Sequence, residues 1–277
     1  MGKRKERKKA KKSRSTLAEK ADRHRLYQKS VQAPEWDIDF FTSTYRKLSK
    51  KTPRVLREDF CGTAYLATAW AAKHHRRRSI GIDFDRETLA WGQRNNVDRA
   101  GPKVAARVQL ISGDVLDAEA PPADIICAMN FSYCVFKTRE SLAAYLRAAR
   151  RGLADDGLLV LELYGGTEAI TELEEERPVG KVTYIWEQER YNPITNETVC
   201  HIHFRFKDGS RLDRAFTYDW RLWSIPEVRE LLTETGFSDS RVYWEDVDED
   251  GEGSGDYYVT EEVENQEGWL VYIVARK

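Results

Sequence analysis

The sequence predicts an α/β fold with one mostly parallel sheet of seven strands, helices on both of its faces, and an antiparallel β meander inserted late in the chain. Three observations carry this prediction. Between residues 54 and 164, short β-type runs alternate with helical segments, as in βαβ units. Three further β-type runs between 181 and 219 stand too close together for parallel crossovers. A hydrophobic content of 41% is enough to build a core.

The periodicity and the turn residues give the order of the elements. Strands are expected at 54–58, 79–83, 108–111, 123–128 and 157–164, alternating with helices at 64–73, 86–95 and 141–151. Asp85 stands where an N-cap would begin the second of these helices. The meander runs through 181–190, 198–206 and 211–219. A helix from Pro226 to Thr235 and strands at 240–244 and 269–274 complete the fold.

The two ends of the chain carry opposite charge, although the formal net charge is only −1. Residues 3–14 include nine Lys or Arg and one acid, whereas residues 245–267 include eleven acids and no Lys or Arg. We expect residues 1–20 to form a disordered basic arm and residues 21–50 to form two short helices divided by Pro34. The main domain should then span 51–277, with the insert at 178–224 and the acidic segment 246–267 as a loop between the last two strands.

Composition excludes several classes of protein. No apolar run reaches the roughly 20 residues of a membrane span, and the basic N-terminus lacks the apolar stretch of a secretory signal. The four cysteines (Cys61, Cys127, Cys134 and Cys200) form no CxxC pair and stand near no run of histidines. We therefore expect no metal site, no disulfide and a cytoplasmic location.

Polar or turn-forming residues follow each of the first four predicted strands. The acids Glu58 and Asp59 and the glycine Gly62 follow the first strand; Asp83, Asp114 and Asn130 follow the second, third and fourth. The carboxyl ends of parallel strands meet at one edge of a sheet, and ligands bind there near the point where the strand order reverses. These four endings indicate a site for a nucleotide-like ligand.

The residue types indicate which ligand this edge suits. Gly62 allows close backbone approach at a helix start, and Asp83, about 21 residues later, can accept hydrogen bonds from a ribose diol. The sequence has no GxGxxG and no Walker-type phosphate loop, and acids beside the glycine would repel a pyrophosphate. They favour a ligand with a cationic amino group, which indicates S-adenosylmethionine rather than NAD or ATP. Asp114 can accept a bond from an exocyclic amine, with Val115 against the base.

Four motifs resemble those of class I S-adenosylmethionine-dependent methyltransferases, which have a Rossmann-like fold. They are residues 58–64 (Glu-Asp-Phe-Cys-Gly-Thr-Ala), 81–85 (Gly-Ile-Asp-Phe-Asp), 113–115 (Gly-Asp-Val) and the Asp156-Gly157 turn. The later order of meander, helix and strand pair resembles small-molecule members with an antiparallel insert after the fifth strand. By this resemblance the cofactor would be S-adenosylmethionine, held by Tyr27 on an N-terminal lid helix and by Glu58, Asp59, Gly62, Thr63, Asp83, Phe84, Asp114, Val115 and Asn130.

The cofactor loop departs from the family pattern. Ala64 stands where the final glycine usually lies, and residues 57–60 (Arg-Glu-Asp-Phe) are bulkier and more charged than usual. Either the loop is less open than in the family, or Asp59 rather than Glu58 contacts the cofactor.

The resemblance implies direct SN2 transfer of a methyl group to an acceptor aligned in a dry pocket, without a metal. A base is needed only where the acceptor arrives protonated, and His201, His203 and Tyr218 are the candidates. The histidines either line the acceptor pocket or are exposed. The expected acceptor-binding residues are Tyr133, Tyr164, Trp220, Arg221 and Trp223, although the tryptophans would serve equally as the core of the insert.

Residues 130–133 (Asn-Phe-Ser-Tyr) also admit two interpretations. They either hold a target nitrogen, by likeness to the Asn-Pro-Pro-Tyr motif of exocyclic-amine methyltransferases, or close over the cofactor.

The function expected from these features is methylation of a small-molecule N or O acceptor that lies under the meander and the N-terminal helices. The alternative is an RNA- or ribosome-directed methyltransferase that docks through the basic residues 3–14. A third interpretation, a non-enzymatic scaffold that keeps the fold, is disfavoured by the intact cofactor edge.

Overall fold

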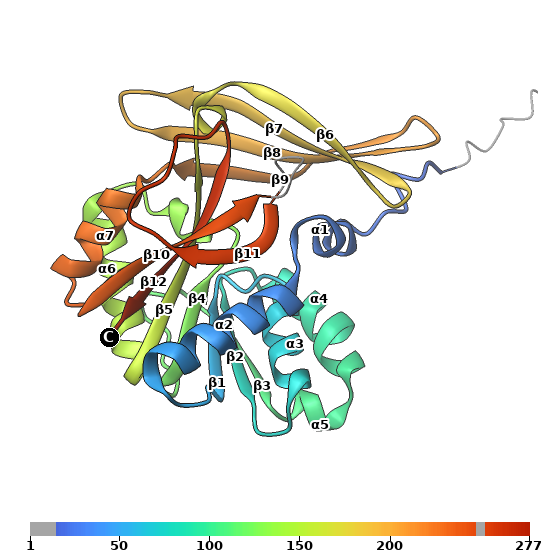
Figure 1. Ribbon diagram of the computed structural model, residues 1–277. Coiled ribbons are helices and arrows are strands. Elements are labelled where there is room, and N and C mark those ends of the chain that lie inside the picture. The colour runs from blue at the N-terminus through green and yellow to red at the C-terminus, as the bar shows by residue number, and fades with distance from the viewer. Residues whose placement is uncertain (1–14, 248–252) are drawn as a thin grey trace, which may run out of the picture.

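The computed structural model describes residues 15–247 and 253–277, and in these ranges it contains two β-sheets (Figure 1). The larger sheet consists of β1 (Val55–Asp59), β2 (Arg78–Asp83), β3 (Val108–Ser112), β4 (Ala123–Ala128), β5 (Leu153–Gly165), β10 (Asp239–Val247), β11 (Gly253–Val259) and β12 (Trp269–Arg276). Its strand order is β11-β10-β12-β5-β4-β1-β2-β3. The smaller sheet consists, in spatial order, of β6 (Leu173–Val179), β7 (Val182–Asn192), β8 (Glu197–Phe206) and β9 (Arg211–Arg221).

The predicted alternation of parallel strands and helices is confirmed. β1 pairs in parallel with β2 and β4, β2 with β3, and β4 with β5. The strand order reverses between β1 and β4, which places the topological switch point at the carboxyl ends of these two strands. β12 lies antiparallel to β5, and β10 lies antiparallel to β12. The sheet is therefore mixed and mostly parallel.

Two strand counts differ from the prediction. The larger sheet has eight described strands rather than seven, because part of the acidic segment that we expected to be a loop forms β11, where Trp244 pairs with Tyr258. The acids there stand beside the β-forming residues Tyr257, Tyr258 and Val259, which pair with β10. The insert has four strands rather than three and begins before residue 178. Its first strand, β6, is Glu-rich, a composition that argues against a strand, but it pairs with β7 along its whole length.

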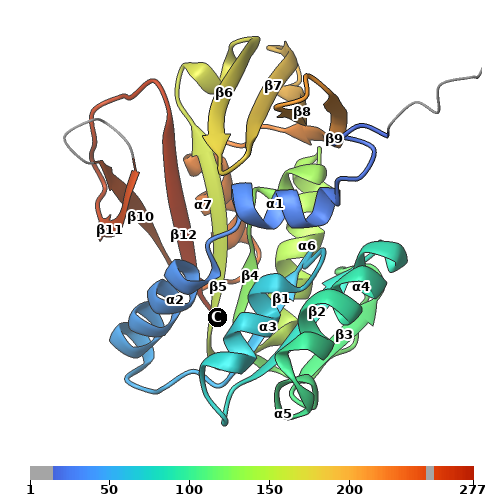
Figure 2. The same cartoon turned by 90° about the vertical axis from the view of Figure 1, so that its right-hand side faces the viewer.

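Helices cover both faces of the larger sheet (Figure 2). One face carries α2 (Pro34–Ser49), α3 (Tyr65–Lys73) and α4 (Arg86–Gly92), and the other carries α6 (Arg139–Gly152) and α7 (Ile225–Glu234). Shorter elements are η1 (Gln93–Val97), η2 (Asp98–Ala100), α5 (Pro102–Ala105), η3 (Ser132–Val135) and η4 (Glu168–Ile170). In α6, Thr138 caps the first turn, and Leu142, Tyr145 and Leu146 recur at helical spacing and are buried. No helix in the described ranges is long and apolar enough to cross a membrane.

The four-stranded sheet lies over the carboxyl ends of the parallel strands, and α1 (Arg23–Val31) runs between the two sheets (Figures 1 and 2). Tyr27 and Val31 of α1 pack against a cluster that includes Ile202 and Phe204 of the smaller sheet. This apolar contact gives α1 its fixed position. The ends of β1 and β4 are consequently covered by the insert and by α1.

Residues 15–20, which we expected to be part of a disordered arm, include a turn that binds the hairpin between β8 and β9. The backbone N–H of Leu17 donates to Asp208 Oδ2 (2.9 Å), and that of Ala18 donates to Ser210 Oγ (3.1 Å). These side-chain acceptors give the segment a fixed place that its own composition does not supply. The rest of the predicted arm, residues 1–14, lies outside the described residues.

Candidate active site

The loop between β1 and α3 is held open by its backbone conformation. Phe60, Gly62 and Ala64 have left-handed φ angles of 59°, 52° and 52°. A Cβ at Gly62 would meet no atom closer than 3.9 Å, so the backbone there borders open space. The loop lines a cavity of about 160 Å³, called here the loop cavity. Ala64 adopts the conformation that a glycine would take, at a cost on the order of 1 kcal/mol, so this departure from the family pattern leaves the loop open.

Strand alternation separates the two acids at the end of β1. Glu58 borders the loop cavity, and its Oε2 accepts a hydrogen bond from the backbone N–H of Ala67 in the first turn of α3 (2.8 Å). Asp59 points to the opposite face, where it accepts hydrogen bonds from Arg57 Nε (2.6 Å) and from the Tyr145 hydroxyl (3.1 Å). Glu58 is therefore the acid that a ligand can reach, and Asp59 belongs to a buried network.

The carboxylate at the end of β2 is tied to the same loop. Asp83 Oδ2 accepts a hydrogen bond from the backbone N–H of Gly62 (2.6 Å), and Oδ1 accepts one from the N–H of Asp85 (2.8 Å). An ionised carboxylate has about four acceptor positions. The backbone does not fill all of these positions, so Asp83 can still accept from a hydroxyl group of a ligand.

The other residues predicted to hold the adenine end are arranged along the edge formed by β2 and β3. Phe84 is 82% exposed although it is large and apolar, so its ring is free to cover a flat ligand. Asp114 is exposed at the end of β3. Val115 is buried, and its carbonyl accepts a hydrogen bond from Arg57 Nη2 (3.2 Å). It is therefore part of the buried network that includes Arg57 and Asp59.

The lid helix α1 closes the loop cavity on one side. Tyr27 borders this cavity, and its ring packs on Phe216 of β9 with 4.8 Å between centroids. The neighbouring Gln28 Nε2 donates a hydrogen bond to Thr63 Oγ1 in the loop (2.8 Å). The helix is thereby attached both to the insert and to the loop that follows β1.

Asn130 forms part of the wall of three cavities. It and Phe131 follow β4 with left-handed φ angles of 51° and 57°, and the backbone N–H of Asn130 donates to the Glu162 carboxylate. Consecutive left-handed residues other than glycine are strained, and such strain is concentrated at functional sites. Besides the loop cavity, Asn130 lines an acidic cavity of about 440 Å³ and an aromatic cavity of about 290 Å³.

The acidic cavity lies between the α1–α2 connection and strands β10 to β12. Four carboxyl groups line it, those of Asp37, Glu58, Glu162 and Glu245, and no described Lys, Arg or His does. Burial raises the pKa of Glu58 and of Glu162 to about 8, and that of Asp37 to about 6. A cation that enters this cavity would favour the ionised form of each group.

Sequence reasoning missed three of these acids. Glu162 carries a signal, because it is the only acid in the apolar run 157–164, where a buried charge calls for an explanation. Asp37 and Glu245 carry none, since each stands in a segment with other charged residues. Packing of α2 and β10 against the carboxyl edge brings them to the cavity.

The aromatic cavity lies under the four-stranded sheet. Of the predicted residues, Tyr27, Tyr164, Tyr218 and Trp220 line it. Tyr218 stacks on Trp220 with 4.3 Å between ring centroids. Burial raises the pKa of Tyr218 well above its usual value. The hydroxyl therefore keeps its proton at neutral pH and donates hydrogen bonds rather than acting as a base.

Three predicted acceptor-binding residues line none of these cavities. Tyr133 is fully buried in the core on the α6 face. Arg221 binds Glu227 on α7 (2.8 Å) and lies over the Trp223 ring, whose Nε1 donates to the carbonyl of Phe136 (3.1 Å). The tryptophan and the arginine thus fasten the insert to the main domain.

His201 and His203 lie on the outer face of the four-stranded sheet, away from the aromatic cavity. Side chains alternate along β8, so that Ile202 faces the cavity and its two neighbours face the other way. Both imidazoles are buried, and each pairs with a glutamate of β7: His201 Nε2 with Glu189 (2.6 Å) and His203 Nε2 with Glu187 (2.8 Å). The structure therefore brings neither histidine to the predicted acceptor pocket.

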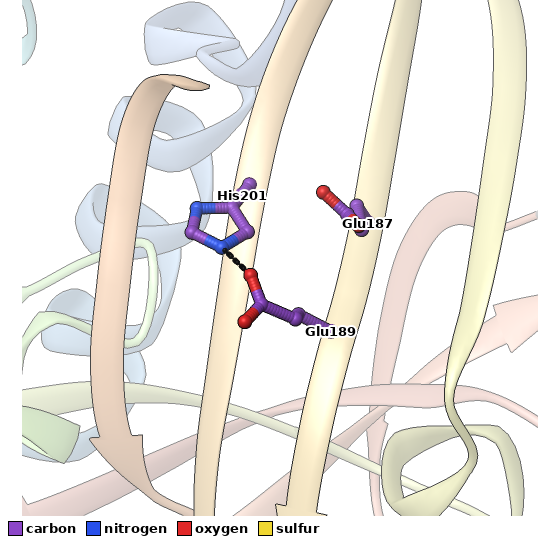
Figure 3. A group of neighbouring side chains, drawn as sticks. All are labelled: Glu187, Glu189 and His201. Carbon is purple, nitrogen blue, oxygen red and sulfur yellow. Dashed lines mark hydrogen bonds and ion pairs between the residues drawn. The ribbon is translucent and has the colours of Figure 1, made fainter. Parts of the chain in front are cut away.

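The outer face carries a group of side chains able to hold a metal ion. Glu187, Glu189 and His201 each offer one ligand atom, and these atoms lie within 4.8 Å of one another (Figure 3). The sequence predicted no metal site, because pairing of β7 with β8 rather than sequence spacing brings the three together. Arg214 Nη2 also binds Glu189 (2.7 Å) and would compete with an ion for that carboxylate.

The residues around the loop cavity fit S-adenosylmethionine. The open backbone at Gly62 lines this cavity. Asp83, which has free acceptor positions, and the exposed ring of Phe84 line none of the three cavities, but they follow the neighbouring strand β2 and suit a nucleoside. The buried carboxyl group of Glu58 suits an ammonium group. No described Lys or Arg lines the cavity, and the buried carboxyl group of Glu58 would repel the phosphates of a dinucleotide.

No protein-family model matches the sequence, and no curated protein matches it. Solved structures match over most of the chain. An S-adenosylmethionine-dependent methyltransferase from Clostridium acetobutylicum has a TM-score of 0.67 and 14% identity, with 91% of this chain and 96% of that one covered. An amino pentose methyltransferase from Micromonospora echinaspora has a TM-score of 0.64 and 14% identity, with 91% and 95% covered. A sugar N-methyltransferase from Streptoalloteichus has a TM-score of 0.63 and 14% identity, with 100% and 99% covered. The chain therefore has the fold of the class I S-adenosylmethionine-dependent methyltransferases, with a separate four-stranded antiparallel sheet.

Proposed function

We propose that this protein is an S-adenosylmethionine-dependent methyltransferase that acts on the nitrogen of a small-molecule amine. The observation that carries the proposal is the position of Asn130, at the wall shared by the loop, acidic and aromatic cavities. A donor in the loop cavity and an acceptor in the aromatic cavity would meet beside this residue. The fold is shared with a sugar N-methyltransferase and a glycopeptide N-methyltransferase, which supports a nitrogen acceptor.

The donor would be held by groups already in place around the loop. Asp83 would accept hydrogen bonds from the ribose hydroxyls, Phe84 would cover the adenine, and Glu58 would pair with the ammonium of the methionine part. S-adenosylmethionine supplies a methyl group already attached to its leaving group. The protein therefore has to align the acceptor and exclude water. Tyr27 serves the second purpose, because it borders both the loop cavity and the aromatic cavity.

The acceptor would arrive as an ammonium ion and must lose a proton before its nitrogen can react. Aromatic rings attract such a cation, and the aromatic cavity supplies them in Phe131, Tyr164, Tyr218 and Trp220, while its two charged lining residues, Glu175 and Arg177, are of opposite sign. Burial raises the pKa of Glu162 to about 8, close enough to that of an alkylammonium, roughly 10, for proton transfer. Glu162 also binds the backbone N–H of Asn130. Glu162 lines the neighbouring acidic cavity rather than the aromatic one. We infer that it takes the proton in its ionised form, which an entering cation favours, a role that the sequence assigned to His201, His203 or Tyr218.

Calorimetric titration with S-adenosylmethionine tests the donor half of the proposal. The wild-type protein should bind, and Asp83→Ala should bind at least about tenfold more weakly because it removes charged hydrogen-bond acceptors. Asp155→Ala, at a fully exposed position at the beginning of β5, is the matched control and should bind like the wild type. A folded wild-type protein that does not bind the donor would refute the proposal.

Transfer of labelled methyl groups tests the acceptor half. A panel of primary amines, including amino sugars, should be labelled, and the matched alcohols should not. Label on the alcohols alone would refute the nitrogen assignment. Label in ribosomal RNA would instead support the alternative that rests on residues 3–14, which lie outside the described part of the chain.

A further inference from the structure

A further cavity, of about 380 Å³, lies at the edge of the larger sheet opposite the proposed active site. Five of its eight lining residues are Lys or Arg, and none is an acid: Arg46, Thr52, Pro53, Arg54, Lys73, His74, Arg76 and Arg77. We call it the basic cavity. These residues come from the end of α2, the segment before β1, and the turn between α3 and β2. Segments that precede parallel strands lie at the amino edge of a sheet, so the cavity is remote from the insert and the loop after β1 (Figure 2).

Arg77 is the buried member of this group. Its side chain lies over the Trp70 ring at 3.9 Å from the centroid, and Nη2 donates a hydrogen bond to Thr42 Oγ1 (2.6 Å). The residue is only 8% exposed, and its Nη1 has no hydrogen-bond partner among the described residues. A buried guanidinium without a counter-charge is costly. Its position next to a cavity indicates that an anion completes the site.

The cations around Arg77 are largely uncompensated. Within the described ranges, the side chains of Arg46, Arg54 and Arg76 make no hydrogen bond and no ion pair. Two acids lie near the cavity: Asp39, which is 3.7 Å from Lys73 and mostly exposed, and Asp124, whose Oδ2 accepts a hydrogen bond from the backbone N–H of Arg54 (2.6 Å). Several positive charges therefore face one space, and this is the arrangement that binds polyvalent anions.

The turn that carries three of these residues is fixed in place. Arg107 Nη1 donates hydrogen bonds to the backbone carbonyls of His74 (2.9 Å) and Arg77 (2.7 Å). Arg107 therefore occupies the carbonyl oxygens that would otherwise attract the arginines of the cavity. Desolvation and the neighbouring cations also lower the pKa of His74, as expected in a region of positive potential. The backbone of the turn is thus fixed before any ligand arrives, which lowers the entropic cost of binding.

We propose that the basic cavity binds the phosphoryl groups of a small molecule, at a site separate from the cavities assigned to methyl transfer. Guanidinium groups match phosphate oxygens in pairs. The volume of about 380 Å³ falls in the range of small-ligand pockets, roughly 300–1,000 Å³. A nucleic acid offers the same phosphate chemistry, but it would engage exposed arginines along an open surface rather than a cavity that reaches the buried Arg77.

Titration of the full-length protein with pyrophosphate tests the proposal. At low ionic strength the wild type should bind with a Kd below about 1 mM, and Arg54→Ala/Arg76→Ala should bind at least about tenfold more weakly. The matched control is Arg147→Ala/Arg151→Ala, which removes the same charge from exposed positions on α6. Its Kd for pyrophosphate should change less than about twofold, as expected for remote charges screened by salt. All three proteins should bind S-adenosylmethionine equally.

Each other outcome overturns the proposal. Absence of pyrophosphate binding by the wild type removes it directly. Equal loss of affinity in both double variants shows unspecific attraction to positive charge. No loss of affinity in either variant shows that pyrophosphate binds elsewhere, for example to residues 3–14, which every variant retains. A single-stranded oligonucleotide that binds the wild type more tightly than pyrophosphate does, and loses affinity only in Arg54→Ala/Arg76→Ala, assigns the surface to nucleic acid instead. Because S-adenosylmethionine affinity is measured separately, none of these results depends on the proposed methyl transfer.

Discussion

The two faces of the four-stranded sheet use their polar and aromatic side chains in different ways. On the inner face, Tyr218 and Trp220 border a cavity and are open to a ligand. On the outer face, His201 and His203 are saturated by glutamates of the neighbouring strand. Histidine is the residue type that most often indicates acid–base chemistry near neutral pH. Here the direction of the side chain, rather than its type, decides which residues can meet an acceptor.

The same contrast occurs between neighbours at the end of β1. Glu58 faces the loop and acidic cavities with one backbone N–H as its partner, whereas Asp59 faces a guanidinium and a tyrosine hydroxyl. One carboxyl group is available to a ligand and the other supports the fold. Substitutions on the two sides should therefore separate binding from stability.

The largest effect is expected on the supporting side. Asp59→Asn leaves Arg57 buried without its carboxylate, and removal of one partner of a buried ion pair costs about 3–5 kcal/mol in the free energy of unfolding. Urea denaturation measures the loss. Glu58→Gln is the control at the adjacent position and should be at least as stable as the wild type near pH 7. A loss below about 1 kcal/mol for Asp59→Asn would show that the network does not support the fold.

On the ligand side, Glu58→Gln should weaken S-adenosylmethionine binding at least about tenfold at pH 8.5, because an amide cannot pair with an ammonium group. Burial raises the pKa of Glu58 to about 8, so the difference in affinity between wild type and variant should shrink as the pH falls below 8. Calorimetry at pH 6.5, 7.5 and 8.5 measures this. A difference that is constant with pH would contradict the assignment of Glu58 to the ammonium.

The pH dependence of the unfolding free energy should be opposite to that of ligand affinity: ionisation of Glu58 strengthens binding but destabilises the fold. The ordinary pKa of a glutamate is 4.5, and that of Glu58 in the folded chain is about 8. Between these values the unfolded state releases a proton that the folded state keeps, so the folded state binds more protons. The unfolding free energy of the wild type, relative to Glu58→Gln, should therefore fall as the pH rises from 4.5 to 8 and then stay level. A rise in that window would contradict the burial of this carboxyl group.

The residues proposed to hold the donor could be predicted from the sequence because the evidence for them is local. Glu58 and Gly62 stand within one short loop, and parallel strands bring Asp83 and Asn130 to the same edge without further information. The acidic cavity could not be found in this way. Asp37 and Glu245 are more than 200 residues apart, and only the packing of α2 and β10 places both in one wall.

The sequence also could not predict which side chains of the insert point toward the main domain. Period-2 alternation placed His201 and His203 together on one face, as the structure has them. It could not tell which face turns toward the main domain, because that depends on how the insert folds over the carboxyl edge. The apolar contacts of Ile202 and Phe204 with α1 turn their face of the insert toward the main domain.

The inner and outer faces of the insert should differ in their effect on catalysis. Tyr218→Phe removes a hydroxyl that lines the aromatic cavity, and kcat/KM for an amine acceptor should fall about tenfold, the value of one hydrogen bond made in the transition state. His203→Asn, on the outer face, should change kcat/KM less than about twofold, although it should lower the melting temperature because it leaves Glu187 without its partner. If His203→Asn lowers kcat/KM more than Tyr218→Phe does, the acceptor binds on the outer face of the sheet and the proposed acceptor site is wrong.

The smallest effect is expected at the outer end of the proposed donor site, where Phe84 would provide contact area to a ligand but provides almost none to the fold. Its ring is 82% exposed, so Phe84→Ala should change the unfolding free energy by no more than about 0.5 kcal/mol. Stacking on an aromatic face is worth roughly 0.5–1.5 kcal/mol, so the Kd for S-adenosylmethionine should rise about three- to tenfold. Phe84→Tyr keeps the ring and should restore the affinity. If Phe84→Ala loses stability but no affinity, the ring stabilises the loop and does not contact the ligand. Phe84 would then belong with Asp59 among the residues that support the fold, and Asp83 would remain the proposed ligand contact at the end of β2.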